Sequence, residues 1–272
     1  MNVLKILGIF SLAMMCYSCE DIIDVKLDSS SESIIIEGLI TTEDIPGIVS
    51  VTKSVDYFKP GNVPKVTEAN VEIITNDIII ERLVQFDSGQ YRTYQTQGIP
   101  GAAYTLNVMI DGITYSATST MPKLVVIDSL TFEFLEKSLR SKAGYEVNLN
   151  FSDPVVVDNF YKIEVYRNNK LFPDEKTIRI RNDKYSDGKR ESVNLNGFQS
   201  DGVRFEINDT IRVKLYSIDK QVYTHFNTFR TITGGGFGGS SSTPANPTTN
   251  FTNGALGYFG AVAVSEKMII IK

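Results

Sequence analysis

The feature that most constrains the fold is a series of short β-strand segments that recur about every ten residues in the first half of the chain. The segments are rich in Val, Ile, Thr and Tyr, and several alternate apolar with polar residues, as strands with one buried face do. Asp111-Gly112 separates two of them and is typical of a two-residue hairpin turn. The predicted strands of this half are 33–40, 47–54, 66–74, 77–86, 90–95, 103–110 and 113–120.

A second β-rich unit follows Met121-Pro122, which marks a boundary because proline cannot donate to a β-ladder. Together the two series predict an all-β fold with two β-sandwich units of immunoglobulin-like shape in tandem, over residues 34–122 and 123–272. The predicted strands of the second unit are 125–135, 146–152, 160–167, 177–182, 191–195, 204–207, 210–218, 251–264 and 267–271.

One segment of the second unit has a helical pattern. In 219–230, Val222, Phe226 and Phe229 follow one another at i, i+4 and i+7, and Asp219 can cap the first turn. The sequence therefore predicts one short amphipathic helix that lies against the sandwich. The segment 234–249, rich in Gly, Ser and Pro, is predicted to be a loop.

The N-terminus has the pattern of an export signal. Lys5 precedes an apolar stretch, 6–15, which is about 15 Å long as a helix and therefore too short to span a bilayer. Ser18 is the small residue that a lipoprotein signal peptidase requires before the modified cysteine, whereas Cys16 stands where leucine is usual. We predict a signal peptide over 1–18, lipid on Cys19 and a tether over 19–33; the alternative is an ordinary signal peptide with incidental cysteines.

Charge and cysteine usage narrow the function classes. Cleavage before Cys19 removes Lys5 and leaves 26 basic against 32 acidic residues, a net charge of −6, which argues against nucleic acid as a partner. Both cysteines lie within the first 19 residues, so the remaining chain can form no disulfide within itself. Glu20, Asp21 and Asp24 resemble an acidic tag for export to the cell surface, and a solvated tether is the alternative reading.

Residues for nucleophilic or transition-metal catalysis are scarce. His225 is the single histidine, and its place near the apolar face of the predicted helix favours a buried structural role over a general base. Carboxylates are plentiful, but many occupy expected turns such as 87–89. We therefore assign no catalytic residue and expect no cofactor.

Two further patterns leave alternatives open. Asp183, Asp187 and Glu191 offer oxygen ligands for calcium, but their spacing does not match an EF-hand, so no metal site is assigned. The chain has no tryptophan, 13 tyrosines and 15 phenylalanines; the pairs 57–58 and Tyr91/Tyr94 line either a core or an exposed binding surface, and the core is favoured.

Several segments resemble a Bacteroidetes lipoprotein family described as domain of unknown function 4249. They are IIIEGLI (34–40), VTEANVEI (66–73), SGQY (88–91), IPGAAYTLNV (99–108), ITYSATSTMP (113–122) and NPTTNFTNGALGYFGA (246–261). The resemblance implies a β-sandwich lipoprotein whose relatives are often associated with TonB-dependent outer-membrane transporters. It implies no catalytic residues, and the lipid acceptor that it carries over is Cys19.

These observations predict a non-catalytic lipoprotein of the outer membrane, anchored through lipid on Cys19, with the cell surface favoured over the periplasmic face. Its expected role is accessory to ligand binding or uptake, with a TonB-dependent barrel as partner and loops such as 234–249 as contact regions. An adhesin or pilus-like subunit is the alternative, and a glycan hydrolase that uses two carboxylates is a third.

Overall fold

The computed structural model describes residues 32–55, 61–137, 142–155, 158–172, 178–196, 204–233 and 245–272. Residues 32–272 form one compact unit. Cys19 and the predicted signal peptide and tether up to residue 31 lie outside the described residues. Within the described ranges, no helix combines the length and the hydrophobicity that crossing a bilayer requires.

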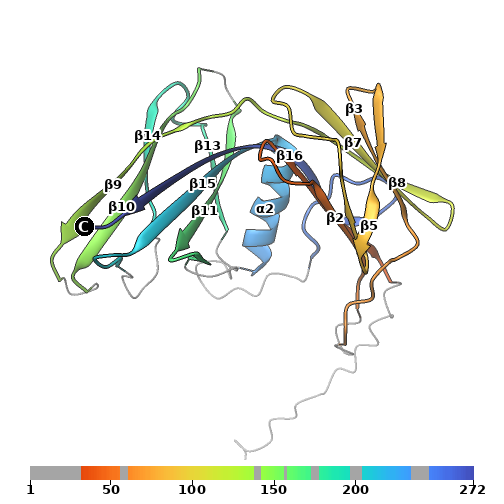
Figure 1. Ribbon diagram of the computed structural model, residues 1–272, viewed down its shortest axis with the longest axis horizontal. Helices are drawn as coiled ribbons and strands as arrows, with labels where there is room; N and C mark the ends of the chain where they lie inside the picture. Colours follow the sequence, from red (N-terminus) through yellow and green to blue (C-terminus); the bar gives the residue numbers. More distant parts are fainter. Residues whose placement is uncertain are drawn as a thin grey trace, which may run out of the picture. The chain divides into compact units, whose positions relative to one another are not determined.

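Strands dominate the described chain, which confirms the predicted all-β class (Figure 1). The strands before the boundary at Met121 are β1 (Ile34–Thr41), β2 (Ile48–Lys53), β3 (Asn70–Thr75), β4 (Ile79–Arg82), β5 (Val84–Asp87), β6 (Gln90–Arg92), β7 (Ala103–Ile110) and β8 (Ile113–Thr120). The elements after it are β9 (Ile127–Leu135), β10 (Gly144–Ser152), β11 (Phe160–Arg167), β12 (Lys170–Leu171), β13 (Arg179–Asn182), β14 (Arg190–Asn194), β15 (Thr210–Ile218), α2 (Lys220–Thr233) and β16 (Leu256–Ile270).

Local turn chemistry sets the β7–β8 hairpin as predicted. Ile110 pairs with Ile113, and the two residues between them, Asp111 and Gly112, have φ angles of 49° and 79°. Positive φ at both central positions is what a type I′ turn requires, and Asp-Gly tolerates it. By contrast, the predicted strand 77–86 is divided at Leu83 into β4 and β5, which belong to different sheets.

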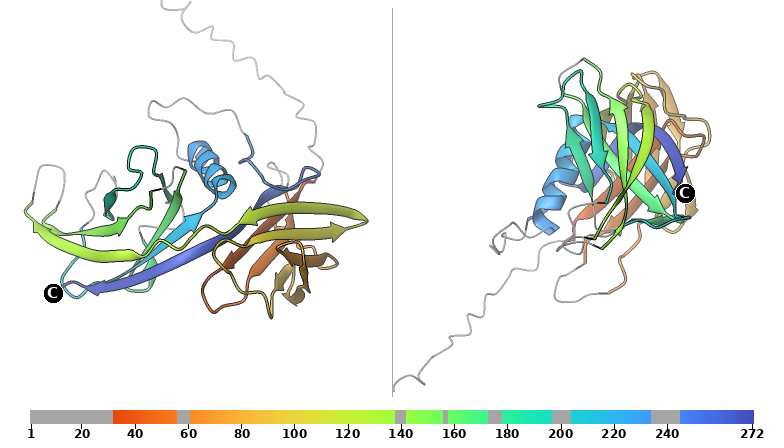
Figure 2. Two further views of the ribbon diagram at one scale, coloured as in Figure 1. Left: turned by 90° about the horizontal axis from the view of Figure 1, so that it is seen from above. Right: turned by 90° about the vertical axis from the view of Figure 1, so that its left-hand side faces the viewer.

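The last strand, β16, links the two halves of the described chain (Figures 1 and 2). Its first part pairs in parallel with β1, from Leu256 opposite Ile35 to Val262 opposite Thr41. Its second part pairs antiparallel with β15, up to Ile270 opposite Thr210. The two predicted C-terminal strands are therefore one continuous strand, which joins β12-β11-β15 and β1-β2-β6-β5 into one sheet. The division into two tandem immunoglobulin-like domains stays a prediction.

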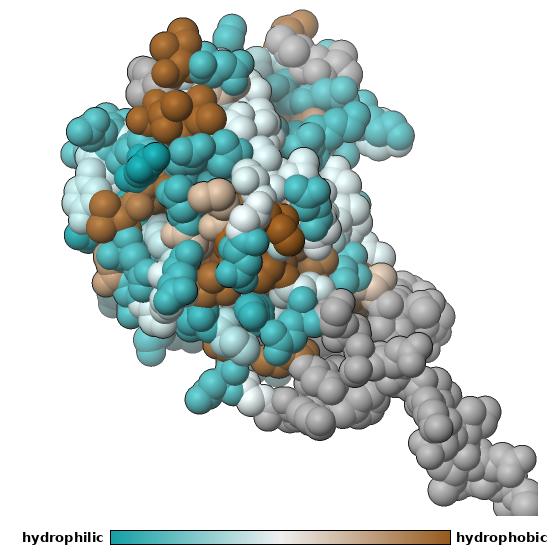
Figure 3. Space-filling model, turned by 90° about the vertical axis from the view of Figure 1, so that its right-hand side faces the viewer, coloured by the Kyte–Doolittle hydropathy of each residue, from teal (hydrophilic) through white to brown (hydrophobic). Residues whose placement is uncertain are grey.

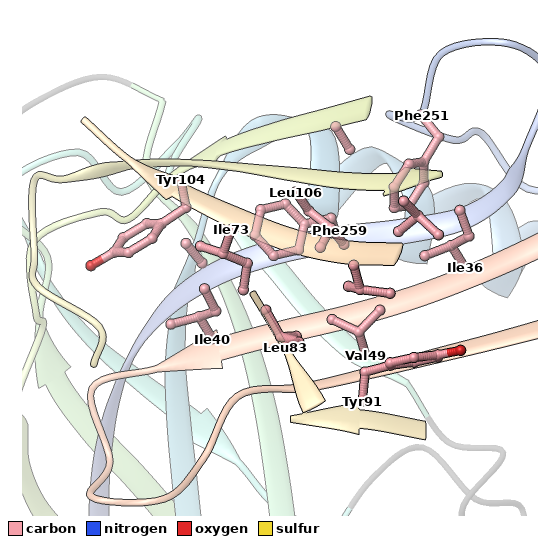
Figure 4. Close-up of a cluster of buried hydrophobic side chains, with 14 of the residues drawn as sticks. Ile36, Ile40, Val49, Ile73, Leu83, Tyr91, Tyr104, Leu106, Phe251 and Phe259 are labelled. Atoms are coloured by element: carbon pink, nitrogen blue, oxygen red, sulfur yellow. The ribbon is translucent and has the colours of Figure 1, made fainter. Parts of the chain in front are cut away.

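The first core lies between β1, β2 and β6 of this sheet and the smaller sheet β4-β3-β7-β8 (Figure 4). Ile36, Tyr104 and Phe259 are fully buried in it. Phe259 comes from β16, so the C-terminal strand completes a core that is otherwise built mostly from residues before 122. Gly257, at φ 94°, lies so close to the backbone of Ile36 that no side chain fits there.

The second core lies between the sheet β14-β10-β9 and the strands β11 and β15. Its centre contains fully buried Val147, Phe151 and Val213, and Ile271 closes it just after β16. Successive residues of β11 alternate between this core and the opposite face of the sheet, as the period of two in a strand dictates. The opposite face of β11 therefore carries Lys162, Glu164 and Tyr166.

The helix α2 covers that opposite face. The predicted cap is confirmed, because Asp219 Oδ1 accepts a hydrogen bond from Val222 N at 2.8 Å. Val222 is buried against Tyr216, Ile218 and Val262 in a third, smaller cluster. The other carboxylate oxygen of Asp219 accepts from the Ser119 hydroxyl, which ties the helix N-terminus to β8.

Candidate functional site

A cavity of about 230 Å³ lies beneath α2, on the sheet face opposite the second core. Its apolar wall includes Phe226 and Phe229 of the helix and Tyr258 of β16. Its polar lining includes Glu37, Lys162, Glu164, Arg179 and His225. A cavity of this kind, apolar with a few converging polar groups, is the usual form of a small-molecule site, although its volume is below the common range.

Glu164 accepts three side-chain hydrogen bonds in the cavity. Its carboxylate accepts hydrogen bonds from Lys162 Nζ at 2.7 Å, Tyr216 Oη at 2.7 Å and Tyr166 Oη at 2.8 Å. Burial alone would raise the pKa of Glu164, but the Lys162 ammonium and these donors outweigh it and lower the pKa. Glu164 is therefore held ionised, as a fixed negative charge, and is unsuited to act as a proton donor.

His225 is buried, as predicted from its place on the helix, and one nitrogen of its ring is hydrogen-bonded. Its Nδ1 lies 2.7 Å from the carbonyl oxygen of Thr248, so Nδ1 carries the proton and donates. Its ring also packs against Phe226 and Tyr258. Burial lowers the pKa of His225, and the Thr248 carbonyl and Glu37 offset part of this shift. The neutral imidazole is thus the stable form.

The residue types in the cavity lining bear on nucleophilic and glycosidic chemistry. Among the described residues that line it there is neither a serine nor a cysteine for His225 to activate. A glycosidase also needs one carboxylic acid with a raised pKa, whereas the pKa of Glu164 is lowered. What the lining offers is a fixed charge pair, Lys162–Glu164, beside aromatic rings.

The three acids that the sequence suggested as calcium ligands are only partly brought together. Asp183 and Asp187 lie side by side in the connection between β13 and β14, and Asp153, directly after β10, joins them. Glu191 instead pairs with Arg181 at 2.6 Å. Sequence reasoning missed Asp153 because it lies 30 positions before Asp183, and only the pairing of β10 with β14 brings the two together.

The aromatic residues considered as a binding surface differ in their exposure to solvent. Tyr91 is buried in the first core, and its hydroxyl donates to the Val66 carbonyl at 3.1 Å. Tyr94 is 62% exposed and lies beneath the Arg92 guanidinium, while the pair 57–58 lies outside the described residues. On the face shown in Figure 3, hydrophobic residues are interspersed with hydrophilic ones.

The remaining predicted contact region is the loop 234–249, of which 234–244 lies outside the described residues. The part that follows is fixed to the helix: Thr248 N donates to Thr228 Oγ1 at 3.0 Å, in addition to the bond between Thr248 and His225. This end of the loop is therefore held against His225, which lines the cavity.

The model of a protein family described as Domain of unknown function (DUF4249) matches residues 20–268 of the chain. No curated protein matches the chain. The family match covers all the described residues up to 268, and with them both cores, α2 and the cavity.

Proposed function

Since the chain belongs to the family Domain of unknown function (DUF4249), a description that names no activity, we propose its function from its own residues. The proposed function is that of a non-catalytic, lipid-anchored binding protein of the outer membrane. The observation that carries the binding role is the cavity beneath α2, with its charge pair and aromatic wall. The lipid anchor rests on Ser18-Cys19 after the apolar stretch.

The chemistry of the cavity indicates the kind of group that it accepts. Its volume of about 230 Å³ suits a small ligand, or the tip of a partner's loop, rather than a large molecule. Phe226, Phe229 and Tyr258 offer contact to an apolar or aromatic portion, while Lys162 and Glu164 can orient a polar group. Thr248, in the described part of the loop 234–249, bonds to His225 of the cavity lining.

We propose that the partner is a TonB-dependent outer-membrane transporter and that the cavity takes part in the contact. Affinity purification of the lipidated protein from native outer membranes, followed by mass spectrometry, tests this. The expected result is stoichiometric recovery of such a barrel. Recovery of the lipoprotein alone would contradict a stable transporter complex.

A matched pair of variants tests the cavity itself. Phe229 is 37% exposed at the cavity and Phe86 is 42% exposed on β5, so each tolerates a charged residue without disrupting a core. Phe229→Glu adds a third carboxylate to a cavity that Glu37 and Glu164 already line, and it is expected to reduce barrel recovery at least tenfold, whereas Phe86→Glu should leave it unchanged. Equal recovery with both variants would exclude the cavity as the contact.

The anchor is tested separately. Intact-mass measurement should show diacyl or triacyl modification of a chain that begins at Cys19, and Cys19→Ser should abolish it and release the protein from the membrane fraction. Cys16→Ser is the control and should remain lipidated. Membrane retention of an unmodified Cys19→Ser chain would contradict lipid as the anchor.

A further inference from the structure

Three carboxylates meet at one end of the second core, away from the helix cavity. Asp153 directly follows β10, and Asp183 and Asp187 belong to the connection between β13 and β14. One carboxylate oxygen of each residue lies within 4.8 Å of one oxygen of each of the others. None of the three lines the cavity beneath α2.

Two buried oxygens of this acidic cluster have no partner among the residues that the structure describes. Asp183 is 2% exposed and Asp153 is 5% exposed. Asp183 Oδ2 and Asp187 Oδ1 are buried and accept no hydrogen bond from the described residues. Buried polar atoms without a partner are rare because they lose their hydration without compensation, so each calls for an explanation such as a bound ion.

The oxygens of Asp153 are already used by the protein. Oδ1 accepts from the Tyr161 hydroxyl, and Oδ2 accepts from Gly188 N at 3.1 Å. Burial, together with the negative charges of Asp183 and Asp187, raises the pKa of Asp153 even though these two bonds lower it. The three groups are thus close enough to repel one another, which is a cost that a cation would remove.

Neighbouring basic side chains do not neutralise the cluster. Arg181 pairs with Glu191, Lys189 Nζ donates to the Tyr185 carbonyl, and Lys184 lies over the Tyr185 ring. In the described part of the chain, no ion pair involves Asp153, Asp183 or Asp187. Among the described residues, no basic side chain therefore balances the charge of the three carboxylates.

We propose that Asp153, Asp183 and Asp187 bind one hard divalent cation, and that this cation is calcium. All three ligand groups are carboxylates, which hard cations prefer, and no nitrogen or sulfur ligand belongs to the set. A calcium–oxygen bond is about 2.4 Å long, so oxygens up to about 4.8 Å apart can share one ion. Calcium also accepts irregular geometry and completes its coordination with water.

Bound calcium would fasten the two sheets of the second core at this end. β13 pairs with β11, whereas β14 pairs with β10, so the connection between them passes from one sheet to the other. The backbone already holds it to β10 at one point, where Asp153 N donates to the Lys189 carbonyl at 3.0 Å. The hydrogen bond from Gly188 N to Asp153 Oδ2 is a second link, and the cation would add a third, from Asp153 to Asp183 and Asp187.

Calcium titration of the full chain, after removal of divalent ions with a chelator, tests the proposal. We expect one equivalent bound with a Kd below about 1 mM, and a Tm increase of about 3–6 °C at ten times that Kd. Magnesium should give a smaller shift, because it demands near-ideal octahedral geometry. If about 10 mM calcium, ten times the upper limit of the expected Kd, gave neither heat of binding nor a change in Tm, the site would be overturned. A larger Tm increase with magnesium than with calcium would overturn calcium as the ion.

Matched variants locate the ion. Asp183→Asn and Asp187→Asn remove one ligand charge each and should abolish the calcium-dependent shift, while their Tm in chelator should equal or exceed that of the unaltered chain because repulsion is reduced. Asp77→Asn is the control: Asp77 is exposed in the β3–β4 turn, and asparagine accepts its φ of 59°. A calcium shift retained in Asp183→Asn would overturn the assignment.

A measurement that needs no variant adds to the test. Lys184 and Lys189 lie in the same connection and are exposed, so trypsin can cleave there when the connection opens. Calcium should slow cleavage after both lysines at least several-fold, without a matching effect after Lys65, which is exposed and pairs with Thr52 beside the first core. Equal rates with calcium and with chelator would overturn the link between the sheets. This proposal is independent of the proposed transporter partner.

Discussion

At the residue scale, His225 illustrates how burial decides what a side chain can do. It is the single histidine, and its ring is 7% exposed between α2 and β16. The carbonyl of Thr248 fixes the proton on Nδ1, so the ring secures the end of the 245–250 segment to the helix. The same burial that removes it from solvent makes its protonated form unfavourable.

This gives the fold a pH dependence. The pKa of His225 in the folded chain is below its ordinary value near 6.5, so the unfolded chain takes up the proton first as pH falls. The stabilisation is complete above that ordinary pKa and is lost as pH falls through it toward the folded value. We expect the urea concentration at the unfolding midpoint to decrease when the pH is lowered from 7.5 to 5.5.

His225→Gln, which can still donate to Thr248, is the control and should flatten this dependence. The titratable groups that share the cavity with His225 remain unchanged in the variant; they are Glu37 on β1, Lys162 and Glu164 on β11, Arg179 on β13 and Tyr258 on β16. An equal decrease in the midpoint for both chains would assign the pH dependence to other groups.

At the element scale, α2 depends on its cap and on the contact of that cap with β8. Asp219 Oδ1 accepts from Val222 N, and Oδ2 accepts from the Ser119 hydroxyl. Ser119 Oγ in turn accepts from Ala261 N of β16, so one short network fixes the helix, β8 and β16 together. The position of the cavity wall on α2 follows from this network.

Asp219→Ala removes the cap and leaves Ser119 without its acceptor, so we expect a loss of about 1–2 kcal/mol in the free energy of unfolding. The Tm should fall by about 2–8 °C, measured by circular dichroism at the helix minimum. Burial raises the pKa of Asp219, despite the bonds that lower it, so the uncharged Asp219→Asn should be much less destabilising. If Asp219→Asn lost as much free energy of unfolding as Asp219→Ala, the charge of Asp219, rather than its capping hydrogen bond, would be the source of its stabilisation.

At the scale of the whole molecule, β16 is the element that both cores share. Phe259 is fully buried in the first core and Ile271, just after the strand, is fully buried in the second. We therefore expect damage to one core to destabilise the other through the shared strand.

We expect residues 32–272 to unfold in a single calorimetric transition. Phe259→Ala should cost about 3–5 kcal/mol of stability and lower the Tm of that one transition. Amide hydrogen exchange in β10, in the second core, should become faster in the same variant, because its slowest exchange requires global unfolding. Two separate transitions, with β10 unaffected, would instead support independent domains.

The sequence alone determined the features that short-range physics controls. Alternating β-branched residues produced strands, Asp111-Gly112 produced its hairpin, and Asp219 with its i, i+4, i+7 apolar set produced α2. Each depends on neighbours within a few residues, so the local pattern is sufficient.

Only the tertiary structure decided what joins distant parts of the chain. Val264 N bonds to Thr42 Oγ1 across 222 positions, and β16 pairs with β1 although the pattern of either strand fits many partners. The cavity beneath α2 and the cluster of Asp153, Asp183 and Asp187 arise in the same way, from strands that are adjacent in space and distant in sequence. Strand periodicity specifies which face is buried but not which strand lies alongside, and long-range pairing is set by the packing of the complete cores.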